Sequence, residues 1–339
     1  MIMLSFPPLY FCALVAATGL AGVIAGQADA EQAASPLMQL EAKIPLGNVE
    51  GRIDHLAIDL SRKRLFIAEL GKGAVGIVDL EGRQVVHTIG GLKEPQGVAY
   101  VPSTDTLFVT NAGDGSVLLF RGSDYEPAGR LDLGADADNI RVDAAANRVF
   151  IGYGDGALAT IDLATNGKIA DIPLQAHPES FQLAHSSRHI FVNVPKAREI
   201  AVIDRFAGKQ TASWPVQNGS NFPMALDEKS ERVLVSFRNP AQLGVFSMRD
   251  GSIIAAIDAC GDADDLFVDE KRQRVYLSCG DGYLDVFEPQ ENSYYRAAHI
   301  PTISGARTSL FVPEIDRLFV AARANPVEPA AIWVFRPTP

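Results

Sequence analysis

The sequence predicts an all-β fold, a seven-bladed β-propeller with four antiparallel strands in each blade. The prediction depends on a period of about 42 residues along the chain and on the short β-type runs inside each period. Turns rich in Gly and Asp separate these runs, and no segment keeps a helical periodicity. Four short strands repeated radially are typical of a propeller. Seven repeats nearly fill residues 31–339, so we expect a single domain there.

A large apolar residue marks the same position in the second β-type run of every repeat, as in LFIA, LFVT and VFIG. This column consists of Phe66, Phe108, Phe150, Phe191, Leu234, Tyr276 and Phe319. A Gly-Asp-Gly turn often follows, as at residues 113–115, and these residue types tolerate the positive φ of tight hairpins. One large apolar side chain in each blade predicts packing between neighbouring blades rather than a cofactor site.

The two ends of the chain are expected to meet in one blade. The last repeat ends near Phe335 after only three strands. Residues 37–47 (LMQLEAKIPLG) resemble an outer strand that has no repeat of its own. We therefore expect the N-terminal strand to complete the last blade, which would remove two exposed sheet edges.

Residues 1–30 have the character of a secretory signal peptide. The stretch 11–26 is apolar and rich in Ala and Gly, and Ala28-Asp29-Ala30 has the form of a cleavage site before Glu31. No Lys or Arg precedes Lys43, so an uncleaved anchor is the alternative. The apolar stretch is shorter than the ~20 residues that span a bilayer, which favours cleavage. A periplasmic or secreted location, without a membrane span in the mature chain, follows as an expectation.

Charge narrows the range of partners. The chain carries 30 Lys and Arg against 41 Asp and Glu, which gives a formal charge of −11. An acidic protein without a basic patch repels the phosphate backbone, so nucleic acid is not an expected partner. We expect a monomer.

Two cysteines remain after the signal segment, Cys260 and Cys279. In an exported protein an even pair predicts a disulfide. The two residues are expected at the same end of neighbouring antiparallel strands, close enough to bridge. A redox or copper site is the alternative, although the sequence has no CxxC motif.

The segments that lead into the innermost strands carry most of the chemistry. Aligning the repeats places these residues at one entrance position: His55, Gln96, Asn139, Ser180, Pro223, Asp265 and Arg307. Their neighbours include further polar residues: Asp54, Glu94, Asp138, Arg141, His177, Glu179, Gln182, Asn221, Asp264 and Thr308. These groups predict a polar binding site at the mouth of the central channel. The alternative is that they cap the channel and bind ordered water and loop backbone.

The ligand-binding candidates are His55, Gln96, Asn139, Arg141, His177, Glu179, Asn221, Asp265 and Arg307. Arg141 and Arg307 could clamp a carboxylate or phosphate, and His55 or His177 could act as a general base.

Metal binding is a further hypothesis for the same position. His55, His177, Glu179 and Asp265 form a mixed N/O set that suits a divalent transition metal. The loops 136–139 (DADN) and 262–265 (DADD) could hold Ca²⁺, but they lack the spacing of an EF-hand, and a turn or capping role is favoured.

The segment FVTNAGDGSV (residues 108–117) is similar to the repeat core of the YVTN, or YncE-like, β-propeller proteins. Related runs occur at FIAELGKGAV, FVNVPKAREI and YLSCGDGYL, so the resemblance covers residues 37–336. It implies a seven-bladed, exported and often periplasmic protein, and it does not specify an activity. A more distant resemblance, to the gluconolactonase family, implies a divalent metal held at the channel mouth. Glu179, Asn139, Asn221 and Asp265 would then be its ligands.

Three functions stay open from the sequence. The first is binding of a small polar or anionic ligand, or of a protein partner, at the channel mouth. The second is a metal-assisted lactonase or lyase at the same place, with His55 or His177 as base and Arg307 stabilising negative charge. The third is a non-catalytic scaffold that uses only its rim.

Overall fold

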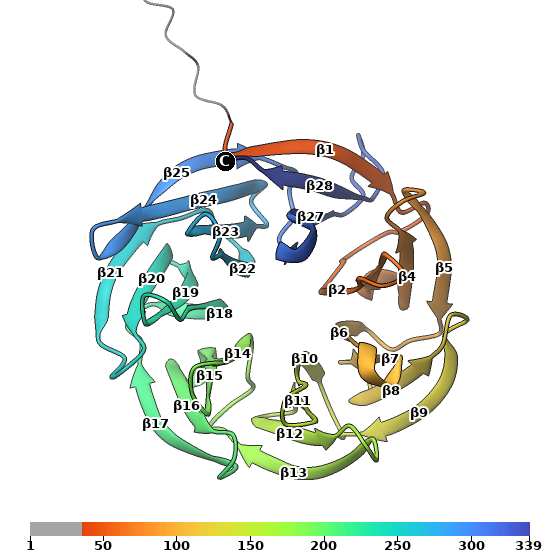
Figure 1. Ribbon diagram of the computed structural model, residues 1–339, viewed down its shortest axis with the longest axis horizontal. Helices are drawn as coiled ribbons and strands as arrows, with labels where there is room; N and C mark the ends of the chain where they lie inside the picture. The colour runs from red at the N-terminus through yellow and green to blue at the C-terminus, as the bar shows by residue number, and fades with distance from the viewer. Residues whose placement is uncertain (1–35) are drawn as a thin grey trace, which may run out of the picture. The chain divides into compact units, whose positions relative to one another are not determined.

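Seven four-stranded antiparallel sheets stand side by side in a closed ring in the computed structural model (Figure 1). The structure describes residues 36–339, and the segment for which a signal peptide is predicted lies outside them. The fold class predicted from the 42-residue period is therefore confirmed. No helix within residues 36–339 is long and apolar enough to cross a membrane.

In each blade the chain runs from the innermost strand outward. The innermost strands are β2 (Leu56–Asp59), β6 (Pro95–Val101), β10 (Ala137–Asp143), β14 (Phe181–Leu183), β18 (Gly219–Asp227), β22 (Ala263–Asp269) and β26 (Ser309–Val312). The second strands are β3 (Arg64–Glu69), β7 (Thr106–Asn111), β11 (Arg148–Tyr153), β15 (His189–Val194), β19 (Arg232–Asn239), β23 (Arg274–Cys279) and β27 (Arg317–Ala322).

The outer half of each blade is made by two further strands. The third strands are β4 (Ala74–Asp79), β8 (Ser116–Arg121), β12 (Ala157–Asp162), β16 (Glu199–Asp204), β20 (Ala241–Ser247), β24 (Tyr283–Gln290) and β28 (Ala331–Pro337). The outermost strands are β5 (Gln84–Gly90), β9 (Glu126–Asp132), β13 (Gly167–Pro173), β17 (Lys209–Pro215), β21 (Ile253–Asp258), β25 (Ser293–Pro301) and β1 (Met38–Pro45). Four short 3₁₀ turns join strands, η1 (Leu70–Lys72), η2 (Pro102–Thr104), η3 (Pro195–Ala197) and η4 (Pro313–Ile315).

The large apolar column on the second strands lies between blades, as expected. All seven of its side chains are buried. Phe66 of the first blade packs with Leu107 and Val109 of the second, and Phe108 packs with Val149 and Ile151 of the third. The repeat therefore places one large apolar side chain of this column at each boundary between blades.

The N-terminal strand closes the last blade. β1 pairs antiparallel with β28, in a register that places Ile44 opposite Ile332. The Glu41 carboxylate forms ion pairs with Arg317 and Arg336, whose Nε atoms lie 2.5 and 3.1 Å from its oxygens. β1 thus covers the edge of β28, which would otherwise lack a partner at the junction of the two ends.

Candidate functional site

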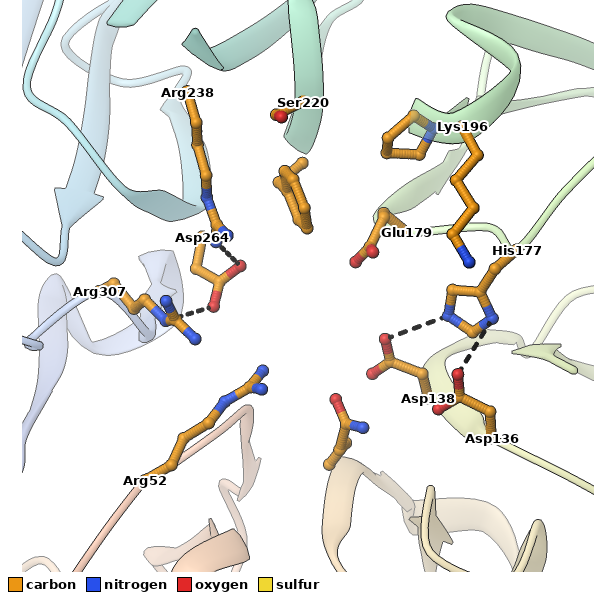
Figure 2. A pocket seen from close by; sticks show the side chains of 13 residues that line it. Arg52, Asp136, Asp138, His177, Glu179, Lys196, Ser220, Arg238, Asp264 and Arg307 are labelled. Atoms are coloured by element: carbon orange, nitrogen blue, oxygen red, sulfur yellow. Dashed lines mark hydrogen bonds and ion pairs between the residues drawn. The ribbon is translucent and has the colours of Figure 1, made fainter. Parts of the chain in front are cut away.

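A pocket of about 490 Å³ lies at the end of the channel where the innermost strands begin. Two kinds of segment form it, the first residues of the innermost strands with the loops that enter them, and the hairpins between the second and third strands. Its lining residues are Arg52, Gln96, Asp136, Asp138, His177, Glu179, Pro195, Lys196, Ser220, Phe222, Arg238, Asp264 and Arg307. Figure 2 shows side chains from several blades that point into this one space. We call it the mouth pocket.

One wall of the mouth pocket is built from guanidinium–carboxylate pairs. Asp264 accepts a hydrogen bond from Nη2 of Arg238 at 2.7 Å and lies 2.9 Å from Nε of Arg307 (Figure 2). Arg307 also donates to Asp262 at 2.9 Å. The guanidinium of Arg238 stacks 3.8 Å above the centre of the Phe222 ring. These contacts hold both guanidinium groups in fixed positions at the pocket surface.

The opposite wall holds His177 between two carboxylates (Figure 2). Its Nδ1 donates to the Gly154 carbonyl oxygen at 2.6 Å and lies 3.5 Å from Asp136, while Nε2 lies 3.9 Å from Asp138. Burial disfavours the imidazolium, but Asp138, the Gly154 carbonyl and Asp136 outweigh it and raise the pKa of His177 to about 9. His177 is therefore protonated at neutral pH and is a donor rather than a base.

On this wall, the side chains of Glu179 and Lys196 are available to contact a ligand. Among residues 36–339, neither side chain has an ion pair or hydrogen bond to another residue, and both point into the pocket (Figure 2). Burial, together with the negative charge of Asp138, raises the pKa of Glu179 to about 7. Glu179 can therefore accept or donate a proton near neutral pH, and Lys196 offers an exposed cation.

Below the mouth, the pocket narrows around His55. Nδ1 of His55 lies 3.5 Å from Asp265, and Nε2 lies 3.7 Å from Asp54. Burial opposes the charge of the imidazole, but Asp265, Asp54 and Asp138 raise the pKa of His55 to about 10. Nη2 of Arg52 lies 2.7 Å from the buried Asp54. Despite these neighbours, burial raises the pKa of Asp54 to about 7.

The predicted ligand-binding residues divide between two levels of the channel. Gln96, His177, Glu179 and Arg307 line the mouth pocket. His55, Arg141 and Asp265 line a separate, deeper cavity of about 300 Å³. Asn139 is buried between the two levels.

Asn221 was expected to bind a ligand, but its side chain is fully buried in the framework. Its Nδ2 donates to Asn193 Oδ1 at 3.1 Å and to the Glu199 carbonyl at 3.0 Å. It therefore ties β18 to the neighbouring blade, because β15 and β16 carry these two acceptors.

The metal site proposed from the sequence is not assembled. His55 lies against Asp265 on the deeper level, whereas His177 lies at the mouth. Within residues 36–339, the one place where three potential ligand atoms approach within 4.8 Å is Cys260, Cys279 and Asp281. The two sulfur atoms there are bonded to each other. The carboxylates of the two DAD loops also have partners, since His177 contacts the first loop, and Arg238 and Arg307 contact the second.

Six residues of the mouth pocket were missed from the sequence: Arg52, Pro195, Lys196, Ser220, Phe222 and Arg238. Arg238 and Lys196 lie on hairpins between second and third strands, whereas the alignment followed only the innermost strands. A signal for them exists, because VPKARE and FRNPAQ replace the Gly-Asp-Gly turn of other blades with longer cationic side chains.

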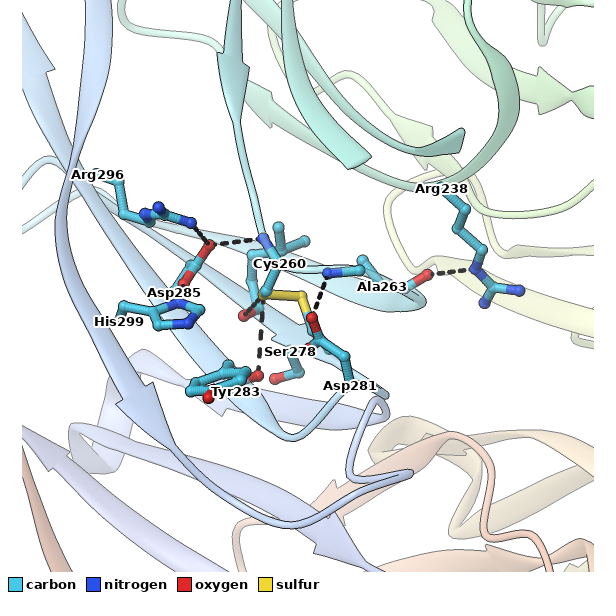
Figure 3. The surroundings of a disulfide bond; sticks show 12 residues. Arg238, Cys260, Ala263, Ser278, Asp281, Tyr283, Asp285, Arg296 and His299 are labelled. Atoms are coloured by element: carbon cyan, nitrogen blue, oxygen red, sulfur yellow. Dashed lines mark hydrogen bonds and ion pairs between the residues drawn. A yellow bond between two sulfur atoms is a disulfide. The ribbon is translucent and has the colours of Figure 1, made fainter. Parts of the chain in front are cut away.

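The two cysteines lie at disulfide distance, with Cα atoms 5.8 Å apart and a bond drawn between the sulfurs (Figure 3). The bridge joins the loop before β22 to the end of β23. The amide of Cys260 also donates to Asp285 at 2.8 Å, and the amide of Gly261 donates to Asp281 at 2.8 Å. The bonded loop carries Asp262 and Asp264, so the bridge anchors the acids that hold the arginine wall.

Comparison with known proteins supports the fold alone. No protein-family model matches the chain, and no curated protein sequence matches it. A chain of hydrazine synthase from Kuenenia stuttgartiensis superposes with a TM-score of 0.69 at 14% identity, covering 81% of this chain and 94% of that one. A chain in a crystal structure of a mitotic checkpoint complex gives a TM-score of 0.75 at 13% identity, covering 93% and 98%. At these identities the likeness shows a β-propeller and does not transfer a function.

Proposed function

We propose that the chain is an exported seven-bladed β-propeller of the YVTN type that binds a small, hydroxyl-bearing anion in the mouth pocket. The observation that carries this proposal is the charge of the pocket. Five cationic residues line it against four acidic ones, and Asp54 and Asp262 each add a carboxylate that pairs with Arg52 and Arg307, so the pocket is close to neutral in a protein whose net charge is −11. Since Glu179 has a pKa of about 7, part of that negative charge is absent at neutral pH. The pocket thus favours an anion where the rest of the surface repels one.

The arrangement of the cations supports a carboxylate or a similar compact anion. Arg52, Arg238 and Arg307 lie on one side of the space, and Lys196 lies on the other (Figure 2). Arg238 and Arg307 are already held in place by Asp264, so a ligand does not have to order them.

Hydroxyl groups fit the remaining lining. Glu179 and the Gln96 amide both border the pocket, and they can accept or exchange hydrogen bonds with several hydroxyls. Phe222 also borders the pocket, and the part of its ring that Arg238 does not cover offers an apolar surface for the C–H groups of a sugar-like ligand. A polyhydroxylated carboxylic acid has the carboxylate, hydroxyl and C–H groups that this lining can bind.

Export is part of the proposal. The cysteine pair at disulfide distance favours an oxidising compartment, in agreement with the signal peptide predicted over residues 1–30. A periplasmic or secreted monomer is the form in which we expect the protein to act.

Glu179 favours a second candidate, an enzyme at the same site. A carboxyl group with a pKa near 7 is suited to general acid–base catalysis, whereas His55 and His177 hold their protons at this pH. In a lyase or lactonase reaction Glu179 would transfer the proton, and Arg307 would stabilise the developing negative charge. This assignment replaces the histidine base expected from the sequence.

The experiment is isothermal titration of residues 31–339 with gluconate, and with glucose as the neutral comparator. We expect gluconate to bind with one site per chain and glucose to bind at least about tenfold more weakly. Arg307→Gln should weaken gluconate binding, and Arg249→Gln, on a remote exposed pair, should not. Equal binding of gluconate by the wild type and Arg307→Gln, or no binding at all, would contradict the proposal and leave a protein partner or a rim scaffold.

A further inference from the structure

The deeper cavity of about 300 Å³ differs in chemistry from the mouth pocket. Most of its lining residues are apolar, among them Leu56, Ile58, Val98 and Ile140. A constriction that includes His55 separates the two spaces, because His55 lines both the constriction and the deeper cavity. We call this deeper space the channel chamber. Its volume lies at the low end of the range for small-molecule sites, roughly 300–1,000 Å³.

The wall of the channel chamber follows the repeat. On each innermost strand one residue pairs with the large apolar residue of the second strand. These seven residues are Ala57, Ala99, Arg141, Gln182, Ala225, Phe267 and Leu310. All except Ala225 line the chamber. Because they occupy the same register position in every blade, they form a ring at one depth of the channel. Arg141 is the one charged member.

Arg141 has no acidic partner in this ring. No carboxylate within residues 36–339 lies within 4 Å of its guanidinium, and its one hydrogen bond is donated by Nη1 to the Ile140 carbonyl at 2.8 Å. The Nε and Nη2 edge is therefore available. The nearby Asp265 is already engaged, because it faces His55 at 3.5 Å and accepts the Ser309 amide at 2.8 Å.

A partly buried cation without a direct ion pair is costly, and burial lowers the pKa of Arg141 although the charges of Asp265 and Asp138 oppose this shift. A ligand that brings a single negative charge would balance this guanidinium. A dianion would leave one charge uncompensated in an apolar space. The planar Nε and Nη2 edge matches the two oxygens of a carboxylate. The alanine, leucine and phenylalanine members of the ring would then contact the apolar remainder of the ligand.

We propose that the channel chamber is a second binding site, separate from the mouth pocket, for a monocarboxylate with a compact apolar or aromatic body. Arg141 binds the carboxylate, Gln182 is available for a further hydrogen bond, and Phe267 and Leu310 contact the body. This site goes beyond the proposed function, which concerns the hydroxylated anion at the mouth, and neither depends on the other.

The test uses benzoate as the probe. Its binding to residues 31–339 is measured by isothermal titration and by saturation-transfer NMR. We expect one benzoate per chain, and benzyl alcohol, which keeps the ring but lacks the charge, to bind at least about tenfold more weakly. Arg141→Gln should weaken benzoate binding by about tenfold or more. Ala99→Leu, which fills the chamber and keeps Arg141, should also abolish binding while the far-ultraviolet circular dichroism spectrum stays unchanged.

Arg307→Gln at the mouth is the matched control, because it removes a guanidinium from the other cavity. Benzoate binding should survive this change, while gluconate binding weakens. Benzoate that binds Arg141→Gln or Ala99→Leu as well as it binds the wild type would overturn the proposal. Failure of the wild type to bind benzoate would overturn it as well. Both results would leave the proposal for the mouth pocket intact, since that is tested with gluconate.

Discussion

The carboxylate of Asp264 at the start of blade six accepts a hydrogen bond from Arg238 of blade five at 2.7 Å. This pair joins two blades at the channel mouth, and Arg307 of blade seven approaches the same carboxylate. Three blades therefore share one charged cluster at the point where the pocket opens. The cluster sets the positions of the cations on which the proposed ligand depends.

We expect Arg238→Gln to destabilise the protein by about 1–3 kcal/mol, because it removes a charge-assisted hydrogen bond and the contact with Phe222. Arg249→Gln is the matched control, since it breaks an exposed pair with Glu231 and should change stability by less than about 0.5 kcal/mol. Urea unfolding of both variants measures the difference. Equal losses in the two variants would show that the Arg238–Asp264 pair contributes no more than a surface contact.

His177 should make stability depend on pH in the alkaline range. Its pKa is about 9 in the folded protein and near the ordinary value of 6.5 in the unfolded chain. Protonation of His177 therefore contributes stability that is complete below about pH 6.5 and is lost as the pH rises through 9. We expect His177→Gln to cost roughly 1–3 kcal/mol at pH 6 and much less at pH 10. A cost that is the same at both values would contradict the assignment, and NMR titration of the imidazole would locate its pKa directly.

Closure of the ring by the N-terminal strand can be tested at Ile44. This side chain is buried in the core that joins the first and last blades, so Ile44→Ala should cost about 2–5 kcal/mol. Leu40 lies on the same strand but is 42% exposed, and Leu40→Ala should cost about 1 kcal/mol or less. Thermal unfolding of the two variants compares them. A small loss for Ile44→Ala would mean that β1 adds little to the last blade.

The disulfide should stabilise the loop that carries Asp262 and Asp264. Its cysteines are separated by 19 positions, so replacing both with serine should cost about 3 kcal/mol in the chain-entropy model. Reduction of the wild type should lower its melting temperature to that of the double variant, and the reductant should leave the double variant unchanged. A wild type that is insensitive to the reductant would argue against the bond.

The sequence allowed the ring to be predicted because the fold repeats one local pattern. A large, buried apolar side chain recurs in the second strand, from Phe66 to Phe319, and each repeat needs the next one to cover it. The N-terminal closure followed from the same arithmetic, since Phe335 ends a blade that still lacks a strand.

The site could be predicted only in part. Aligning the entrance residues of the repeats shows which residues face the central channel, but it does not show how deep in the channel each side chain lies. His55 is the entrance residue of the first blade. In the fourth blade the entrance residue is Ser180, and His177 lies three residues before it. That offset places the two imidazoles on different levels and separates the expected metal ligands. Lys196 and Arg238 were missed for another reason. They reach the pocket from hairpins between the second and third strands, and the alignment followed only the innermost strands.

The most direct test of the central claim is to map gluconate on the protein by NMR of the ¹⁵N-labelled chain, residues 31–339. We expect the amide resonances of Glu179, Lys196 and Arg238 to move on addition of gluconate and to stay in place with glucose. The resonances of Glu228 and Glu270, which line a pocket at the opposite end of the channel, should not respond. Shifts confined to that opposite end, or the absence of any shift, would contradict a binding site at the mouth.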